Sequence, residues 1–409
     1  MVSSVGAIRA GALVRSASGE TVKVLHVIPS LAPRYGGPSR AVVEMCRALR
    51  GGGVETLIAT TDADGDGRLA VELERPVLYE GVPAIFFPRQ WSEAYKYSPP
   101  LGRWLDRHVA DFDAVHIHAV FSHACLAGAK ACRRHKVPYV VRPLGTLDPW
   151  SMRQKRFRKM LFWRFGVRRM LDGAAAIHYT ARPEQKLAEE SLGLKHGIVI
   201  PLGVEMDSLD KAEHADCLSA GKMSLCRNPY VIVLSRLHKK KGLELLLPAF
   251  LALVRRREFA SWKLVLAGDG EPGYVNSLRR LVQAHEGDDS VVFAGWVEGP
   301  RKNGMLQRAS LLALPSYQEN FGLCVVEAMA CGVPVLISPH VNLAPEIEAA
   351  GAGWVTPSES DALEHALAEA LGDPQARARR GAIGRELVAR RFTWAAVSQQ
   401  LSALYNSIK

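Results

Sequence analysis

No apolar run in the 409-residue sequence approaches the ~18 to 20 residues that a membrane-spanning helix needs. The opening residues 1–20 are small and polar, Arg9 and Arg15 break their apolar stretch, and no cleavage-like segment follows a long apolar core. The sequence therefore predicts a soluble or peripheral protein that begins with a flexible leader and not with a signal peptide.

Cysteine is scarce, and its seven residues are scattered without the paired spacing of a metal site. An odd number of isolated thiols fits a reducing cytoplasm best. Zinc-finger, RNP and helix-turn-helix signatures are also missing, so nucleic acid is the partner class with the least support. We expect a cytoplasmic protein, with peripheral contact to the cytoplasmic membrane face as a further prediction.

Acidic residues are fewer than basic ones: the sequence has 52 Lys and Arg but 41 Asp and Glu, and its net charge is +11. Such a balance favours acidic partners: nucleotides, phospholipid head groups or anionic lipid-linked acceptors. With 48% hydrophobic and 23% charged residues, the composition is that of an ordinary globular protein, and the length predicts two domains.

The most informative stretch is Ser316–Pro334, which joins an apolar strand at Leu311–Leu314 to a helix at Gly322–Ala330. In such a strand–turn–helix unit, ligands bind beyond the carboxyl end of the strand, where the first amides of the helix point. Glu319 lies in the turn and Glu327 lies in the helix, so the two carboxylates suit different parts of one long ligand. A surface Glu and a helix-face Glu without function would share this spacing.

A pair of cations follows the first strand of the second half, Y-V-I-V-L-S. Arg236 and Lys241 stand between that strand and a helix that begins near Gly242. Two cations and the helix amides would converge there on one anion. A basic turn without function is the alternative.

Two features of the first half also end predicted strands. Gly36 and Gly37 follow the strand Val22–Pro29, where glycine lets backbone amides approach a phosphate or sugar, although a tight turn would use the same residues. His116 and His118 share one face of the strand Ala114–His118, with His118 at its carboxyl end. Two histidines packed within a strand are the simpler interpretation.

The string P-S-Y-x-E-x-F-G-x-x-x-x-E-A-M-A-C-G-x-P-V resembles the signature of the retaining glycosyltransferases of GT-B fold, chiefly glycosyltransferase family 4 (group 1). The resemblance covers roughly Val22 to Tyr405. It implies an α/β protein with two Rossmann-like domains that face a central cleft. The implied divisions are a leader at 1–20, an acceptor-side domain at 21–205, a linker at 206–228, a nucleotide-sugar domain at 229–378, and helices at 379–409 that cross back to the first domain.

The resemblance also implies roles for individual residues. The catalytic set is His118, Arg236, Lys241 and Glu319. The donor-binding set is Gly36, Gly37, Gly268, Gly295, Trp296, Asn320, Phe321, Gly322, Leu323 and Glu327. Arg142, Gly145 and Asp148, in and after the strand Pro138–Arg142, are candidate acceptor contacts.

The implied reaction moves a sugar with retention from a UDP- or GDP-sugar to a hydroxyl of a glycan or lipid-linked acceptor, in cell-envelope or exopolysaccharide synthesis. In the family, the two cations neutralise the departing diphosphate in place of a divalent metal, so we expect no cofactor and no metal. No residue is a clear covalent nucleophile. The family is usually assigned a front-face displacement in which the donor phosphate helps to remove the acceptor proton.

Other interpretations of the motifs remain open. The acidic run at 62–67 has Leu73 where a calcium loop needs Glu, and a D-x-D metal site there would belong to a different glycosyltransferase fold; we expect a solvated loop. The glycine pattern at 268–273 matches a dinucleotide fingerprint, but a whole strand–helix unit precedes it. A phosphorylase, a nucleotide-sugar epimerase, a non-catalytic sugar-nucleotide-binding protein and a dinucleotide oxidoreductase are the alternative functions.

Residues 151–170 interleave basic and apolar side chains. A basic amphipathic helix of this kind lies either on an anionic membrane or with its apolar side on the sheet of its own domain, and different faces could do both.

Overall fold

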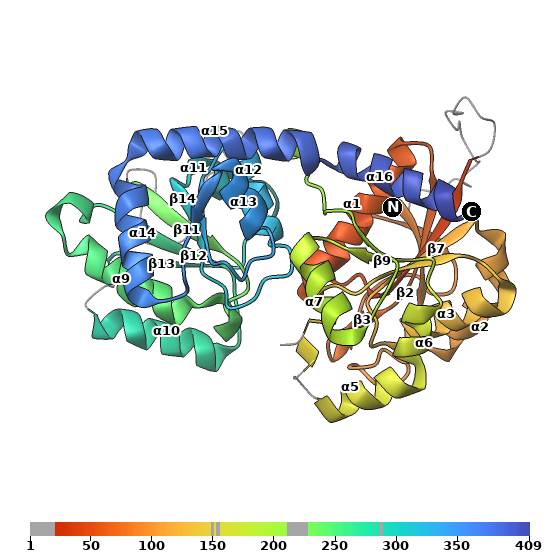
Figure 1. Ribbon diagram of the computed structural model, residues 1–409. Coiled ribbons are helices and arrows are strands. Elements are labelled where there is room, and N and C mark those ends of the chain that lie inside the picture. Colours follow the sequence, from red (N-terminus) through yellow and green to blue (C-terminus); the bar gives the residue numbers. More distant parts are fainter. Residues whose placement is uncertain (1–20, 149–150, 153–155, 211–227, 286–288) are drawn as a thin grey trace, which may run out of the picture. The chain divides into compact units, whose positions relative to one another are not determined.

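The computed structural model describes residues 21–148, 151–152, 156–210, 228–285 and 289–409 (Figure 1). The expected leader at 1–20 and most of the expected linker at 206–228 lie outside these residues. The described chain forms two compact units. The first unit contains residues 21–179, 188–198 and 398–409, and the second contains residues 180–187 and 199–397. Residues 180–187 and 199–205 thus cluster with the second unit.

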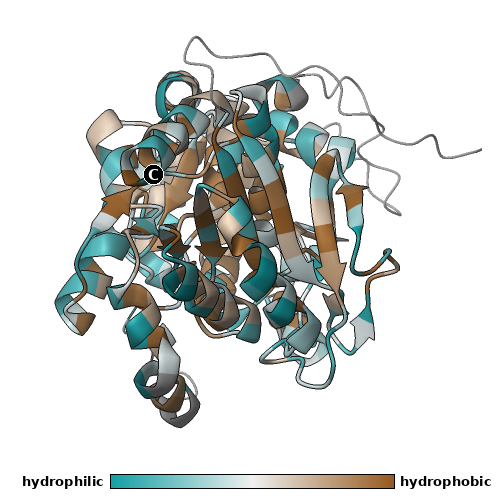
Figure 2. Ribbon diagram, turned by 90° about the vertical axis from the view of Figure 1, so that its right-hand side faces the viewer, coloured by the Kyte–Doolittle hydropathy of each residue, from teal (hydrophilic) through white to brown (hydrophobic). Residues whose placement is uncertain are grey.

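The first unit is built on an eight-stranded sheet with the order β10-β9-β8-β7-β1-β2-β6-β5. Its strands are β1 Lys23–Ser30, β2 Glu55–Thr61, β5 Pro76–Tyr79, β6 Val82–Phe87, β7 Ala114–His118, β8 Tyr139–Arg142, β9 Ala176–Tyr179 and β10 Gly197–Val199. The β1 strand pairs in parallel with β2 and β7, and only β5 is paired antiparallel, with β6, among the registers defined. The strands are apolar along most of their length, as parallel strands covered on both faces must be (Figure 2).

Helices cover both faces of this sheet. The helices are α1 Gly37–Gly51, α2 Pro99–His108, α3 His123–His135, α5 Arg156–Phe162 and α6 Arg168–Asp172, with parts of α7 Arg182–Leu192 and α16 Trp394–Ile408. Residue Cys46 of α1 packs with Ile28, whereas Gly128 of α3 packs against Val27 and Ile117 on the other face. Alternate residues of β1 therefore belong to different layers.

The second unit has a six-stranded parallel sheet with the order β13-β12-β11-β14-β15-β16. Its strands are β11 Tyr230–Leu234, β12 Lys263–Ala267, β13 Val291–Gly295, β14 Leu311–Leu314, β15 Val335–Ile337 and β16 Gly353–Val355. Its helices are α8 Met206–Asp210, α9 Leu243–Val254, α10 Pro272–Ala284, α11 Gly299–Arg308, α12 Leu323–Ala330, α13 Ala344–Ala350, α14 Ser360–Gly372 and α15 Pro374–Arg391. A continuous apolar core joins α9, α10 and α14 to the sheet.

Each sheet has one point where the strand order reverses. In the first unit the chain builds β1, β2 and β6 outward and then returns to place β7 beside β1. In the second unit it builds β11, β12 and β13 and then returns to place β14 beside β11. Open parallel sheets bind ligands at the carboxyl ends of the strands that flank such a reversal. The segments that follow β1, β7, β11 and β14 are therefore the places to look for function.

The structure corrects two expectations. Residues 62–67 are not simply a solvated loop, because Ala63–Asp64 and Gly67–Arg68 form a small hairpin and the Asp62 carboxylate is buried. Asp62 Oδ1 accepts a hydrogen bond of 2.7 Å from the backbone amide of Arg89. The carboxylate therefore joins the segment after β2 to the segment after β6.

Residues 151–170 are not one regular helix. A π-helical turn at Trp163–Val167 separates α5 from α6, and Met170 at the end of the stretch is buried. Residues 153–155 lie outside those described. The side chains of Met160 and Leu161 on α5 are exposed. Part of the stretch therefore packs into the unit, and part presents apolar side chains at the surface.

Candidate functional site

The strand reversal of the second unit brings together a cation and a carboxylate from segments far apart in the sequence. Lys241 ends a short 3-10 turn, Lys239–Lys241, between β11 and α9. Glu319 lies between β14 and α12, and the Lys241 ammonium makes a direct ion pair with the Glu319 carboxylate. The side chains are 17% and 20% exposed, so the pair is within reach of an incoming ligand.

Backbone hydrogen bonds hold the two segments in place. The Tyr317 amide donates to the Lys240 carbonyl at 2.8 Å, and the Glu319 amide donates to the His340 carbonyl at 3.0 Å. Gly242 has a positive φ of 65°, and a Cβ there would lie 2.4 Å from the carbonyl oxygen of Pro315. Only glycine fits that approach, so the sequence K-G is needed where the loop after β11 crosses the loop after β14.

Arg236, the second predicted cation, is exposed in the segment after β11. The backbone on either side of it is fixed, because the Ser235 amide donates to Ala267 and the Leu237 amide donates to Asp269. Gly268 allows this, since a Cβ on it would lie 1.8 Å from the Ser235 carbonyl oxygen. The structure therefore gives Gly268 a packing reason that needs no ligand.

The second predicted carboxylate, Glu327, is buried in α12 and paired with a residue that the sequence did not indicate. Lys302 Nζ of α11 lies 2.5 Å from Glu327 Oε1, and the side chains are 7% and 10% exposed. A buried carboxylate without such a partner would be strongly destabilising, so the two side chains depend on each other. No signal in the string E-G-P-R-K-N-G distinguishes Lys302 from its neighbours.

In the turn before α12, the side chains have partners within the protein, and the backbone is left to meet a ligand. The Phe321 side chain is buried against Phe392, so its backbone is the part left to meet a ligand. Asn320 donates a hydrogen bond of 3.2 Å to the Thr180 hydroxyl. Gly322, with a φ of 79°, is the N-cap of the helix that begins at Leu323, and the first amides of a helix carry positive partial charge.

Gly295 ends β13 at the same edge of the sheet, and Trp296 follows it directly. Gly295 has a φ of 69° and open space where a Cβ would be. The Trp296 ring is 48% exposed, and its indole N–H donates to Glu298 at 3.3 Å. An exposed flat ring beside the other strand ends could pack against a planar group of a ligand.

In the first unit, the strand reversal carries a layer of buried polar side chains on one face of the sheet. The layer consists of His26 on β1, His116 and His118 on β7, Arg142 on β8 and His178 on β9, and all five are buried. The register aligns His26 with His116 and His118 with Arg142. The sequence indicated His116, His118 and Arg142, and strand pairing adds His26 and His178.

Two sets of hydrogen bonds run through this layer. His116 Nδ1 lies 2.8 Å from the Tyr405 hydroxyl of α16, and His116 Nε2 lies 3.2 Å from His178 Nδ1. Separately, His26 Nδ1 lies 3.0 Å from His118 Nε2. Burial, reinforced by the nearby Arg142 guanidinium, lowers the pKa of His26 to about 3. Burial also lowers the pKa of His116 and His118 well below the usual value, so these three imidazoles are neutral at pH 7.

The imidazoles of His26, His116 and His118 are also close enough together to hold a metal ion, because their potential ligand atoms lie within 4.8 Å of one another. Both nitrogens of His116 already have hydrogen-bond partners, however, and the Arg142 guanidinium acts on all three rings. A cation among them would be disfavoured by the guanidinium, so the layer suits neutral hydrogen bonding better.

The remaining predicted residues of the first unit lie at the same carboxyl edge. Gly36 and Gly37 begin α1, with open space where a Cβ would be. Gly145 has a φ of 67° in the turn after β8. Asp148 is buried, and its carboxylate accepts a hydrogen bond of 2.8 Å from the Ser151 amide, so it already stabilises the start of the following segment.

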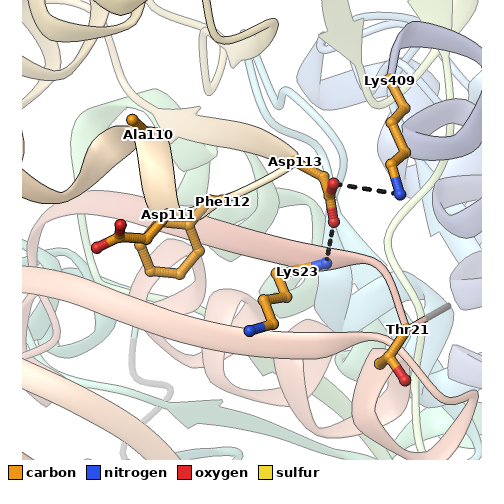
Figure 3. Close-up of a pocket in the computed structure, with 7 residues that line it drawn as sticks. All are labelled: Thr21, Lys23, Ala110, Asp111, Phe112, Asp113 and Lys409. Atoms are coloured by element: carbon orange, nitrogen blue, oxygen red, sulfur yellow. Dashed lines mark hydrogen bonds and ion pairs between the residues drawn. The ribbon is translucent and has the colours of Figure 1, made fainter.

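One surface pocket lies away from all these residues. It is lined by Thr21, Lys23, Ala110, Asp111, Phe112, Asp113 and Lys409, and Asp113 pairs with Lys409 at 3.2 Å (Figure 3). Lys23 starts β1 and Asp113 directly precedes β7, so this pocket is at the amino-terminal edge of the sheet. Ligands of parallel sheets bind at the other edge, and we do not assign it to the site.

Comparison with known proteins gives two family matches. Residues 226–387 match the family model of glycosyl transferases group 1, and residues 36–203 match the glycosyl transferase 4-like domain. The GDP-mannose:cellobiosyl-diphosphopolyprenol alpha-mannosyltransferase of Komagataeibacter xylinus is 24% identical over 95% of this chain and 94% of its own length. The phosphatidyl-myo-inositol mannosyltransferase of Mycobacterium leprae is 28% identical over 91% of this chain and 93% of its own.

Solved structures agree on the fold. Anabaena HepE in complex with UDP and glucose superposes with a TM-score of 0.74 at 22% identity, and covers 94% of this chain and 100% of its own. The sucrose-phosphate synthase of Thermosynechococcus elongatus gives the same score at 20% identity, with 94% and 98% covered. The expected α/β architecture of two Rossmann-like domains is confirmed.

Proposed function

Because the chain belongs to the group 1 glycosyl transferases and has the GT-B fold, we propose that it transfers a hexose with retention from a GDP- or UDP-sugar to a hydroxyl acceptor. That it is a glycosyltransferase using a nucleotide-sugar donor follows from the family. The stereochemistry and the residue roles below are proposals. The observation that carries them is the meeting of Lys241 and Glu319 at the strand reversal of the second unit.

We assign the diphosphate of the donor to Arg236, Lys241 and the first amides of α12. In the structure, Lys241 neutralises Glu319, and a diphosphate would compete for the same ammonium. As the sugar leaves, negative charge grows on the diphosphate, and fixed cations and amides then stabilise it more than they stabilise the bound donor. Removal of one such group commonly costs about 3–4 kcal/mol of transition-state stabilisation. No divalent metal is part of this proposal.

The carboxylates would hold the two ends of the donor. Glu319, once released from Lys241, accepts hydrogen bonds from sugar hydroxyls, and Glu327 accepts hydrogen bonds from the ribose diol. Lys302 supports this assignment because it takes one oxygen of Glu327 and leaves the other for the ribose. Gly295 and Trp296 are assigned to the base, and the amides of Asn320 to Leu323 to the transferred sugar. Gly36 and Gly37 complete the proposed donor contacts.

We assign His118 to the reacting sugar or the acceptor, with Arg142, Gly145 and Asp148 as acceptor-side residues. Arg142 and Asp148 are buried, so their proposed role on the acceptor side is to support the loop that follows β8. The two mannosyltransferases named above act on cellobiosyl-diphosphopolyprenol and on phosphatidyl-myo-inositol. An anionic lipid-linked acceptor also fits the net charge of +11.

We further propose that the α5 surface contacts the anionic membrane that carries such an acceptor. Met160 and Leu161 have exposed apolar side chains, and the basic residues Arg164 and Arg169, which follow in the sequence, are exposed as well. Each basic side chain near an anionic surface contributes about 1 kcal/mol. No helix among the described residues is long and apolar enough to span a bilayer.

A donor screen tests the proposed function. Thermal unfolding is followed with UDP-, GDP- and ADP-sugars in EDTA, because a ligand that binds only the folded state raises the unfolding temperature. The donor that stabilises the protein is then incubated with polyprenyl-diphosphate and phosphatidylinositol glycans, and the anomeric configuration of the product is read by NMR. We expect transfer in EDTA with retention. Release of sugar 1-phosphate in the presence of inorganic phosphate would instead indicate a phosphorylase.

A further inference from the structure

The buried polar layer of the first unit contains one complete hydrogen-bonded set and one incomplete set. In the complete set, His116 uses both ring nitrogens, one with Tyr405 and one with His178. In the incomplete set, His26 and His118 bond only to each other. Among the described residues, His26 Nε2 and His118 Nδ1 are buried without any hydrogen-bond partner.

Buried ring nitrogens without partners are rare, because each loses its hydrogen bonds to water on folding and gains nothing in return. A complete network a few ångströms away shows that this layer can satisfy such groups when their role is only structural. The open Nδ1 of His118 therefore points to a group outside the chain. His118 is the last residue of β7, at the carboxyl end of one of the two strands that flank the reversal of the first sheet, where ligands of such sheets bind, whereas His26 lies in the middle of β1.

The contact between His26 and His118 holds one proton. If His26 Nδ1–H donates to His118 Nε2, then His118 carries its own proton on Nδ1 and presents a donor. If His118 Nε2–H donates instead, its Nδ1 is bare and presents an acceptor. The two rings are nearly parallel, with an interplanar angle of 9° and centroids 5.3 Å apart, so the contact also fixes the ring orientation.

We propose that His26 is a positioning residue that fixes the tautomer and orientation of His118, and thereby decides whether Nδ1 of His118 donates to or accepts from a substrate hydroxyl. This inference rests on the proposed function, because it assumes that His118 meets the substrate. Among the described residues, His118 is the only side-chain hydrogen-bond partner of His26, and His26 acts through that bond. The hydrogen-bonded set of Tyr405, His116 and His178 has no part in this role.

The test compares three variants of the full chain. His26→Leu removes the hydrogen bond, and His26→Asn keeps an amide group near the position of Nδ1 that can hold the His118 ring. Tyr405→Phe is the matched control, since it removes one buried hydrogen bond from the complete set and leaves the contact between His26 and His118 intact. Sugar transfer is measured with the donor found by the screen, and nitrogen-15 NMR of histidine-labelled protein reports the tautomer of His118.

We expect His26→Leu to lower kcat about tenfold to 100-fold with little change in the KM of the donor, because the misoriented His118 affects the reacting complex and not the binding of the donor. Its NMR spectrum should show His118 as a mixture of tautomers, where the wild type shows one. His26→Asn should recover part of kcat, and Tyr405→Phe should keep it within about twofold.

Three results would overturn the inference. They are an unchanged kcat in folded His26→Leu, an unchanged His118 tautomer in the same variant, and an equal loss of kcat in Tyr405→Phe. Stoichiometric zinc bound to His26 and His118 in the purified protein would also overturn it, because the nitrogens would then serve a metal. If the wild type transfers no sugar, the proposed function fails and the inference fails with it. The NMR spectrum would still show whether His26 and His118 are hydrogen-bonded.

Discussion

The ion pair between Lys302 and Glu327 gives the sharpest prediction about stability. Lys302→Met replaces the cation with an apolar side chain of similar length and leaves the Glu327 carboxylate buried without its partner. The two side chains are only 7% and 10% exposed, so water cannot replace the lost contact. Removal of one partner from a buried pair costs about 3–5 kcal/mol, and this is the expected loss.

Calorimetry can measure that loss. In a unit of this size, 1 kcal/mol shifts the unfolding temperature by about 2–4 °C, so Lys302→Met should unfold roughly 6–20 °C earlier. The double variant Lys302→Met/Glu327→Leu should recover most of the stability, because an apolar pair avoids the buried charge. Arg390→Met is the control, since Arg390 and Glu386 are 65% and 67% exposed and 3.7 Å apart. Such a surface pair contributes less than about 1 kcal/mol.

The reasoning would be refuted if Lys302→Met unfolded within about 2 °C of the wild type, or if the double variant were no more stable than the single one. Either result would mean that Glu327 has another partner in solution. The proposal that Lys302 leaves one oxygen of Glu327 for the ribose would then lose its support.

Three further predictions follow from the same structure. Glu327→Gln should weaken the binding of a ribonucleoside diphosphate about tenfold, as measured by calorimetric titration. It should also abolish most of the protein's preference for the ribonucleotide over its 2′-deoxy analogue, and an unchanged preference would place the ribose elsewhere. Acidification should destabilise the first unit between about pH 6.5 and pH 3, because the buried imidazole of His26, with a pKa of about 3, binds its proton only after unfolding. Each such histidine lowers the free energy of unfolding by up to ~1.4 kcal/mol per pH unit in this range. A free energy of unfolding that does not change with pH in denaturation experiments would contradict the burial of His26. Gly268→Ala should lower the unfolding temperature more than Gly295→Ala, because a Cβ at Gly268 meets the Ser235 carbonyl at 1.8 Å, whereas a Cβ at Gly295 brings only the strain of a positive φ; equal thermal shifts would contradict the packing.

Much of the fold can be predicted from the sequence, because parallel strands are short apolar runs that end in turn residues. The strand before Arg236 and the helix after Gly242 were both predicted and are β11 and α9. Family resemblance supplied the pairing of distant segments, and the contact between Lys241 and Glu319 is what that pairing produces. Their roles in binding remain predictions.

What the sequence did not indicate depends on contacts between elements. Lys302 sits in a helix of ordinary composition, and only the packing of α11 against α12 brings it to Glu327. The position of His26 became meaningful only when β1 was placed beside β7. With the calcium and D-x-D sites disfavoured, the sequence predicts a solvated loop at 62–67, yet the Asp62 carboxylate is buried and accepts a hydrogen bond from the amide of Arg89.

The regular helix expected over residues 151–170 failed for a related reason. The alternation of basic and apolar side chains fits a helix along its whole length, but a π-helical turn interrupts the helix at Trp163–Val167, where Gly166 lies against Leu126 of α3. Periodicity alone carries no information about such a neighbour.

The central claim is that Arg236 and Lys241 hold the diphosphate of a nucleotide sugar, and binding of the nucleoside diphosphate itself tests it most directly. Titration calorimetry in EDTA should compare Arg236→Ala and Lys241→Ala with Lys239→Ala, which removes an equal charge from an exposed neighbour in the same turn. A charge-assisted hydrogen bond is worth about 1.5–3 kcal/mol, so the first two variants should bind roughly 10- to 150-fold more weakly, and the third should bind as the wild type does. Equal affinities in all three variants would contradict the claim.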